Sequence, residues 1–310
     1  MGLLLAFIAS VFISASNYFM RRSIDAGGTV KIFLIIQMCV GFLVAILIGP
    51  VVGHFFSFNP SIAFLGIGTG LLLAVMLYFL GKALETGPAG FTFSIVSAAT
   101  IVPGIVMASI FGASLGFDYT VWHGLGSLLV LLGIFWGGKG LSGIQNRFKW
   151  IGFLSIIFSL HVAILVVYQW RAVLMNLVNP EAYFSFFTAE QIKSLWFNPM
   201  LYFGTALGLV ILYFKEGFRL PKKEEWNFGV VGGILHCTST FFLIKGTEVA
   251  TGMENVIIFP LFSVGIIVLS NLWSQKIYQE KINWRACQVC AFGILIGTVD
   301  WKVVANLFGW

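Results

Sequence analysis

The residues best suited to chemistry in this sequence are ionisable groups that lie inside long apolar runs. Glu254 lies near the start of one such run, and His161 and His236 lie near the middles of two others. A carboxylate surrounded by hydrocarbon is costly unless it is protonated, paired or in contact with water, so it marks a functional site by default. A histidine titrates near neutral pH and can carry a proton. The pattern predicts a polar pathway through an apolar protein, with Glu254 as its proton-coupling group.

Each of these residues also has a structural explanation, and the sequence leaves both open. Glu254 fits the first turn of a helix, where the helix dipole favours a negative charge. Each histidine could donate a hydrogen bond that holds two helices together. His236 and Thr240 lie four residues apart and share one helical face, which favours substrate contact for this pair. Neither histidine has a carboxylate at ligand spacing, and the four cysteines form no zinc-type set, so no metal site and no cofactor are expected.

A second set of charged residues recurs at a constant distance along the chain. Lys82 and Glu85 reappear 163 positions later as Lys245 and Glu248. Lys and Glu three residues apart can pair on one helical face, and an exposed pair of this kind contributes only ~0–1 kcal/mol. Its repetition predicts a second role, gating at the two mouths of a cavity. The same offset relates Gly41 to Gly204, Gly66 to Gly229, Gly70 to Gly233 and Phe79 to Phe242, which predicts a duplicated module. The glycines four residues apart also predict close packing between helices.

Composition excludes an ordinary soluble protein. The chain has 310 residues, of which 59% are hydrophobic and only 10% charged, and its mean hydropathy is +0.96. A soluble domain has roughly 25% charged residues. The net charge of +6 does not indicate a nucleic-acid partner, because the basic residues lie in short runs between apolar segments rather than in one patch. The first apolar run has no basic residues before it, so we expect a retained helix rather than a cleaved signal peptide.

Ten runs are long enough to cross the hydrocarbon core, which takes about 20 apolar residues in a helix. Most connections are short, but residues 171–195 mix charged and aromatic side chains and predict a short helix at the membrane interface. The predicted fold is an all-α membrane protein with ten transmembrane helices, as two five-helix repeats at 1–143 and 144–310. The ten runs are 2–20, 32–52, 61–81, 88–112, 119–138, 150–170, 196–214, 227–247, 251–274 and 285–305.

The basic residues predict an orientation. Fourteen of the eighteen lie in the first, third, fifth, seventh and ninth loops, so these loops are expected in the cytoplasm and both termini outside. Because each half has an odd number of spans, the second half must cross the membrane upside down relative to the first. Lys82 would then face the cytoplasm and Lys245 the exterior. Two inverted halves around a central cavity are typical of secondary transporters.

With these features the chain resembles the drug/metabolite transporter superfamily in its EamA-like, ten-helix form. The resemblance covers nearly the whole length. It rests on the short-looped halves and on the segments Lys82-Ala83-Leu84-Glu85-Thr86-Gly87-Pro88-Ala89, Ala99-Thr100-Ile101-Val102-Pro103-Gly104 and Leu131-Leu132-Gly133-Ile134, with Phe259-Pro260-Leu261 and Ile294-Leu295-Ile296-Gly297-Thr298-Val299 as their echoes. The chain departs from the family in two respects. Many relatives have both termini in the cytoplasm, and Pro260 matches Ser97 rather than Pro103 at the 163-residue offset.

The resemblance implies a central cavity lined by the first, third, fourth, sixth, eighth and ninth spans. Few polar residues lie in those spans, and they are the predicted substrate contacts. Glu254 is the predicted proton-coupling residue, and the two Lys–Glu pairs are the predicted gates. The substrate contacts are His236, His161, Thr240, Asn255, Gln169, Tyr78, Asn17 and Ser97.

The sequence therefore predicts a secondary active transporter for a small polar or amphiphilic metabolite, driven by protons or by exchange with a counter-substrate. We expect a monomer or homodimer in contact with membrane lipid, located in the inner membrane of a bacterium. Passive facilitation stays open as an alternative. A membrane-embedded enzyme would need acids or a metal cluster at one interface, which the twelve acidic residues do not form, so no enzyme is expected. A non-transporting receptor or scaffold also stays open.

Overall fold

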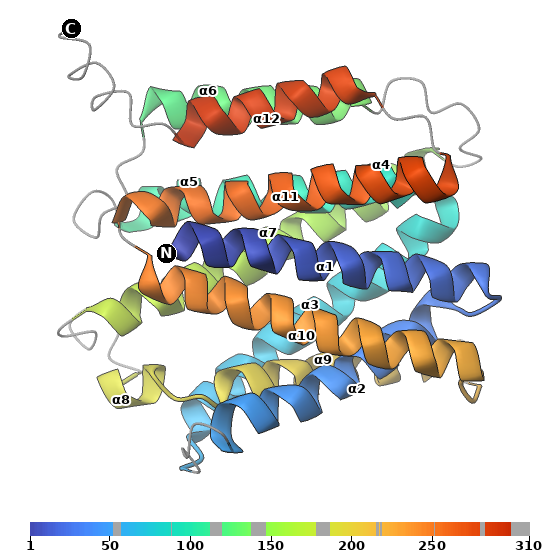
Figure 1. The fold of residues 1–310 in the computed structure, drawn as a ribbon. Coiled ribbons are helices and arrows are strands. Elements are labelled where there is room, and N and C mark those ends of the chain that lie inside the picture. Colours follow the sequence, from blue (N-terminus) through green and yellow to red (C-terminus); the bar gives the residue numbers. More distant parts are fainter. Residues whose placement is uncertain are drawn as a thin grey trace, which may run out of the picture.

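The computed structural model describes residues 1–51, 57–87, 89–111, 120–137, 147–177, 187–214, 217, 219–250, 252–279 and 283–298. The described part of the chain is helical and contains no strand (Figure 1). The helices are α1 (Gly2–Asp25), α2 (Val30–Ile46) with the π-helical turn η1 (Leu47–Val51), α3 (Pro60–Thr86), α4 (Ala89–Ala98), the 3-10 turn η2 (Ala99–Ile101), α5 (Val102–Phe111), α6 (Val121–Gly137), α7 (Arg147–Asn176), α8 (Ala189–Ile192), α9 (Phe197–Phe214), α10 (Lys223–Val249), α11 (Gly252–Tyr278) and α12 (Trp284–Thr298).

Six of these helical segments are long and apolar enough to cross a membrane: α1, α2 with η1, α3, α7, α9 and α10. Three shorter apolar stretches lie at 95–107, 121–133 and 284–297. The membrane class is thereby confirmed, and the chain has the helices of an integral membrane protein. All ten predicted ranges contain helix, but the number of spans stays a prediction, and the predicted boundary at 143–144 lies outside the described residues.

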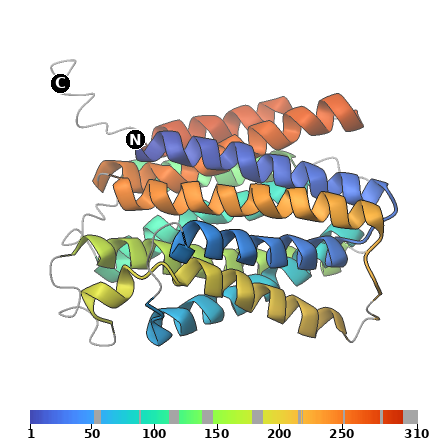
Figure 2. The same ribbon diagram turned by 60° about the horizontal axis from the view of Figure 1, so that its bottom comes forward.

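The long helices run side by side along a common direction, so the molecule has two ends (Figures 1 and 2). Helix α1 packs between α10 and α11, α3 packs against α9 and α7, and α6 packs against α12. The predicted short helix after the sixth span is the four-residue α8, which begins with a capping box between Thr188 and Gln191. Its position relative to a membrane stays a prediction.

Glycines allow several helices to approach closely, as their spacing predicts. A Cβ atom on Gly66 of α3 would lie 2.6 Å from the Phe197 carbonyl of α9. A Cβ on Gly233 of α10 would lie 2.7 Å from the Gln37 carbonyl of α2. These two glycines lie on matching helices of the predicted repeat. At both positions the absence of a side chain allows the backbones of two helices to come into contact. The role of these glycines in helix packing is confirmed.

Helix bounds repeat along the chain at the offset found in the sequence. Helices α3 and α10 both have 27 residues, and Pro60–Thr86 becomes Lys223–Val249 when moved by 163 positions. The starts of α4 and α11, at Ala89 and Gly252, and of α6 and α12, at Val121 and Trp284, differ by the same number. The first two helices of each half do not keep it, since α9 begins 167 positions after Val30. The regularity therefore covers the last three spans of each half.

The fourth predicted span is broken by the turn η2. Proline at 103 has no N–H and clashes with the carbonyl four residues before it, which disfavours a continuous α-helix here. The Thr100 hydroxyl donates to the Ser97 carbonyl at 2.7 Å inside this turn. The Ser263 hydroxyl of α11 also contacts Ser97 and Thr100. The break is thus held against α11 by buried hydroxyl groups.

Candidate functional site

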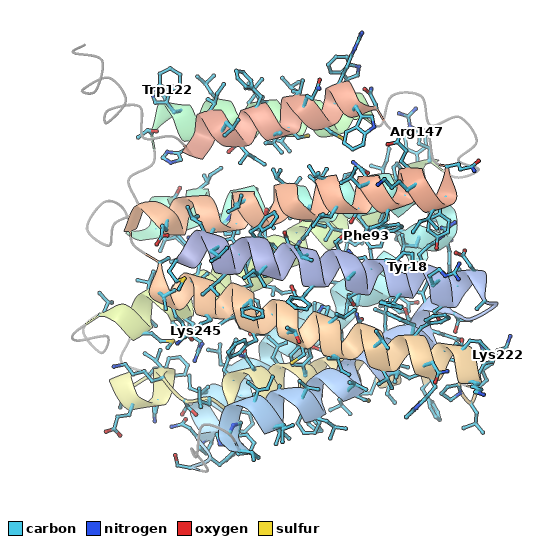
Figure 3. The ribbon with its side chains drawn as sticks, in the orientation of Figure 1. Tyr18, Phe93, Trp122, Arg147, Lys222 and Lys245 are labelled. Carbon is cyan, nitrogen blue, oxygen red and sulfur yellow. The ribbon has the colours of Figure 1, made fainter. Side chains whose placement is uncertain are left out.

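The charged residues divide between the two ends of the helix bundle. Figure 3 shows Lys245 at one end with Trp122, and Lys222 and Arg147 at the other. Lys82 lies at the Lys222 end, because its neighbour Gly81 lies against Val30 at the start of α2. Opposite ends for Lys82 and Lys245 agree with the predicted arrangement. We name the two regions the Lys245 end and the Lys222 end.

A cavity of about 210 Å³ lies at the Lys245 end. It lies between α2 with η1, α7, α9 with the segment before it, and α10. Its wall is mixed, because most of the lining is apolar but several charged and hydrogen-bonding groups converge on it. The apolar lining includes Ala45, Ile48, Leu195, Phe197 and Phe241, and the polar lining includes Arg171, Asn198, Tyr202, Thr240, Lys245 and Glu248.

Arg171 is the most deeply buried charge in this cavity, with 5% of the residue exposed. Its Nη1 lies 3.9 Å from Oε1 of Glu248, and its Nη2 donates to the Ser194 carbonyl at 3.3 Å. The guanidinium carbon lies 4.9 Å from the centre of the Phe197 ring. Its Nε is buried without a hydrogen-bond partner among the described residues. A guanidinium has five N–H donors, so Arg171 keeps donors that these contacts do not use.

Glu248 connects the two cations of the cavity. Its carboxylate lies 3.1 Å from Nζ of Lys245, one turn earlier on α10, and 3.9 Å from Arg171 on α7. The side chain of Lys245 is half exposed, whereas that of Glu248 is 20% exposed. The predicted Lys245–Glu248 pair is therefore real and lines the cavity, and its contact with Arg171 links two helices. Gating by this pair stays a prediction.

Tyr202 forms the inner wall of the cavity and connects it to His236. The Tyr202 hydroxyl and Nδ1 of His236 are 3.2 Å apart, and the two rings meet edge to face. Tyr202 fits here because Gly41 of α2 has no side chain, and a Cβ there would lie 2.7 Å from the tyrosine ring. His236 thus lies one layer behind the cavity, and Thr240, whose hydroxyl donates to the His236 carbonyl at 3.1 Å, lines it directly.

At the Lys222 end a buried carboxylate connects two segments of the chain. Glu225 is fully buried, with 0% exposed, and its oxygens accept five hydrogen bonds. Arg219 donates two of them, at 2.8 and 2.7 Å. The Lys222 amide donates one, and the Thr29 amide and hydroxyl donate two. Because Thr29 precedes α2 and Arg219 precedes α10, this Glu225 cluster ties the α1–α2 connection to the start of α10.

Several predicted substrate contacts lie away from the cavity. Nδ1 of His161 lies 2.7 Å from the Val96 carbonyl and donates a hydrogen bond to it, which connects α7 to α4. The Tyr78 ring lies 5.2 Å from the Tyr213 ring, tilted by 51° to it, and Tyr78 is not part of the cavity lining. Asn17 is half-buried on α1 and Gln169 is buried on α7, and neither is part of the cavity lining; the Gln169 amide oxygen has no partner among the described residues. Ser97 lies near the end of α4, where its carbonyl accepts from Thr100 of η2, and the side chain of Asn255 lies outside the described residues.

The three remaining predicted charges, Glu254, Lys82 and Glu85, form ion pairs with nearby groups. Glu254 accepts from the amino group of Met1 at 3.0 Å and is 19% exposed. It lies at the Lys245 end, outside the lining of the cavity. Lys82 and Glu85 form their predicted pair at 3.6 Å. The proton-coupling role of Glu254 and the gating role of Lys82 stay predictions.

Sequence reasoning missed three cavity residues: Arg171, Tyr202 and Asn198. Arg171 is buried, although its place at the end of an apolar run also suits a side chain that extends its charge to the membrane surface. The sequence held one signal, because Arg171 is a charged residue at the end of a presumed cavity span, as Glu254 is. Tyr202 and Asn198 had no such signal, since a polar residue near a span end is ordinary. Among the described residues no three His, Cys, Asp or Glu side chains gather as a metal site.

Comparison with known proteins shows the fold alone. No family model and no curated protein matches the sequence. A solved structure described only as "Crystal structure of protein" superposes with a TM-score of 0.66, covering 96% of each chain at 15% sequence identity. The helical arrangement over almost the entire chain is thus similar to that of a solved structure.

Proposed function

We propose that this protein is a secondary transporter that carries a small polar or amphiphilic metabolite by alternating access, with its ten spans arranged as two inverted five-helix halves. In that reaction a central site opens to one side of the membrane at a time. The observation that carries the proposal is the difference between the two ends. The Lys245 end holds a polar-lined cavity, whereas at the Lys222 end the Glu225 cluster joins the α1–α2 connection to the start of α10, as a closed gate would require.

The repeated helix bounds support the inverted halves. Thr100 and Ser263 differ by the repeat offset of 163, and their hydroxyl groups meet. A residue that contacts its own counterpart lies at a two-fold axis between matching parts. Helix α6 likewise packs against its counterpart α12, where a Cβ on Gly293 would lie 2.7 Å from the Gly126 carbonyl. These contacts are what an internal two-fold axis requires.

The charge distribution supports an orientation in which the Lys222 end faces the cytoplasm. The cavity would then open to the exterior. We propose a proton gradient or exchange with a counter-substrate as the driving force, with Glu254 as the proton-coupling residue and the inner membrane of a bacterium as the location. Membrane lipid would surround the apolar faces of a monomer or homodimer.

Transport measurements separate this proposal from its alternatives. Purified protein in proteoliposomes should catalyse counterflow of a metabolite selected by thermal-shift screening, since a ligand that binds the folded state raises its melting temperature. A passive facilitator would equilibrate the metabolite without accumulating it under any imposed gradient. A receptor or scaffold would bind it without flux, and a membrane enzyme would convert it. Binding without flux would contradict the proposed function.

A further inference from the structure

We propose that the cavity at the Lys245 end binds a small monoanion through its carboxylate, with Arg171 as the residue that holds it and an apolar tail against Phe241 and Ile48. This inference rests on the proposed function, because it names the substrate class of the same cavity. Because the inference concerns binding, a binding measurement tests it without any measurement of flux.

The first argument is the incomplete pairing of Arg171. A buried ion pair is stable only when its geometry is good and the remaining donors are hydrogen-bonded. The only carboxylate near Arg171 among the described residues is Glu248, which is 3.9 Å away and closer to Lys245 at 3.1 Å. The buried Nε of Arg171 has no partner in the described part of the chain. A planar guanidinium in this state is suited to a carboxylate that accepts two parallel hydrogen bonds.

The second argument is the charge of the cavity wall. Arg171 and Lys245 contribute two positive charges and Glu248 one negative charge, so the described lining has a net charge of +1. One carboxylate neutralises this wall. A dianion would leave a negative charge unpaired beside apolar side chains, which is unfavourable. The count therefore favours a carboxylate over a phosphate or phosphonate.

The third argument is the size and the remaining chemistry of the cavity. A volume of about 210 Å³ is several times what one ordered water needs, so the space suits a metabolite. Ala45, Ile48, Phe241 and Ile244 form an apolar wall on α2 with η1 and on α10. Such a wall favours an aliphatic or aromatic tail. Arg171, near the end of α7, supplies the charge that fixes the head group.

Binding of 4-methylpentanoate to the purified protein in detergent tests the inference. We compare it, in an alkaline buffer where the second phosphonate proton has dissociated, with 4-methylpentanamide, which is neutral, and 3-methylbutylphosphonate, which is then a dianion with the same tail. The carboxylate should bind at least ~10-fold more tightly than the amide, because hydrogen bonds to a charged group are among the strongest in proteins. Equal binding of the amide, or tighter binding of the phosphonate, would overturn the proposal.

Arg171→Lys keeps the positive charge and removes the planar fork, so it should weaken carboxylate binding by ~10-fold or more. Arg21→Lys is the matched control. Arg21 also has one ion pair, to Asp25 at 3.4 Å, and one ring contact, to Tyr278 at 5.3 Å, but lies at the Lys222 end. It should bind like the unmodified protein. If both lysine variants bind equally well, Arg171 only holds the protein together.

Flux of radiolabelled 4-methylpentanoate, corrected with empty liposomes for diffusion of the protonated acid, separates this inference from the proposed function. Arg171-dependent binding without flux would leave the site standing and remove transport. Counterflow of a neutral metabolite, with no binding of 4-methylpentanoate, would leave transport standing and remove the carboxylate site.

Discussion

Helix α10 carries one important glutamate near each end, and the two differ in how completely they are paired. Glu225 is fully buried and accepts five hydrogen bonds at the Lys222 end. Glu248 lies beside the cavity at the Lys245 end, where its two ion pairs span 3.1 and 3.9 Å. A buried polar group without full pairing is costly, whereas a fully paired one makes the local structure rigid.

The difference teaches how one helix can form a fixed contact at one end and line a binding cavity at the other. At the Lys222 end both oxygens of Glu225 accept hydrogen bonds within the protein. At the Lys245 end the carboxylate is shared between Arg171 and Lys245, and Nε of Arg171 has no partner in the described part of the chain. A carboxylate whose oxygens all accept hydrogen bonds within the protein is suited to a closed gate. An ion pair that leaves N–H donors unused is suited to a binding site.

The largest effect on stability is expected from Glu225→Gln. An amide cannot accept both charged hydrogen bonds from Arg219, and breaking a buried ion pair costs about 3–5 kcal/mol. Because the Arg219 side chain is 37% exposed, we expect a smaller cost than this range, about 2–3 kcal/mol. Thermal unfolding in detergent measures it. Glu224→Gln, at the exposed neighbouring position, is the control; equal melting temperatures for both variants would remove the special status of Glu225.

Alanine substitutions of two glycines compare the free space around the backbone at the two ends of the bundle. A Cβ on Gly28 would lie 2.7 Å from Cγ of Glu225 and 2.6 Å from the Ser23 carbonyl, so Gly28→Ala should destabilise by about 1–3 kcal/mol through overpacking. A Cβ on Gly49, in the cavity lining, would lie 3.4 Å from the Leu195 carbonyl, an ordinary contact. Gly49→Ala should therefore stay within about 0.5 kcal/mol. Chemical denaturation of both variants checks this, and the reverse order would contradict it.

Glu248→Gln sharpens the comparison at the open end. Removing this charge should lower the melting temperature less than Glu225→Gln does, because its ion pairs are longer and partly exposed. It should also tighten 4-methylpentanoate binding by roughly 3–10-fold, since Glu248 competes with the ligand for Arg171 and repels its charge. Calorimetric titration measures the affinity. Weaker binding would show that Glu248 positions Arg171 rather than competing with the ligand.

Glu254→Gln should have the smallest effect on stability. Its ion pair with the Met1 amino group involves an exposed partner, and such pairs contribute about 0–1 kcal/mol. If Glu254 couples protons, the variant should bind substrate and retain counterflow but lose uptake driven by a pH gradient. Proteoliposome uptake with and without the gradient tests this. Normal gradient-driven uptake would reduce Glu254 to a first-turn acid.

The helical elements could be predicted closely from the sequence, whereas the site could be predicted only in part. Long apolar runs specify helices directly, and the repeated glycines specified close packing, because both depend on local composition. The Thr240, Lys245 and Glu248 positions were found because polar groups in apolar runs are conspicuous.

The rest of the site depends on contacts between distant segments. Arg171, Tyr202 and Asn198 meet the end of α10 only after α7 and α9 pack beside it. His161 looked equivalent to His236, but its ring donates a hydrogen bond to the Val96 carbonyl of α4, which makes it a contact between helices. No spacing in the sequence encodes which carbonyl a histidine will reach.

The most direct test of one-sided access is the labelling of a single cysteine in the cavity. In a chain whose native Cys39, Cys237, Cys287 and Cys290 are replaced by alanine, Thr240→Cys is exposed to a membrane-impermeant maleimide from either face of sealed vesicles of opposite orientation. We predict faster labelling from the Lys245 end, and increased labelling from the Lys222 end when Glu225→Gln is added. Equal labelling from both ends without that change, or faster labelling from the Lys222 end, would contradict a cavity closed by the Glu225 cluster.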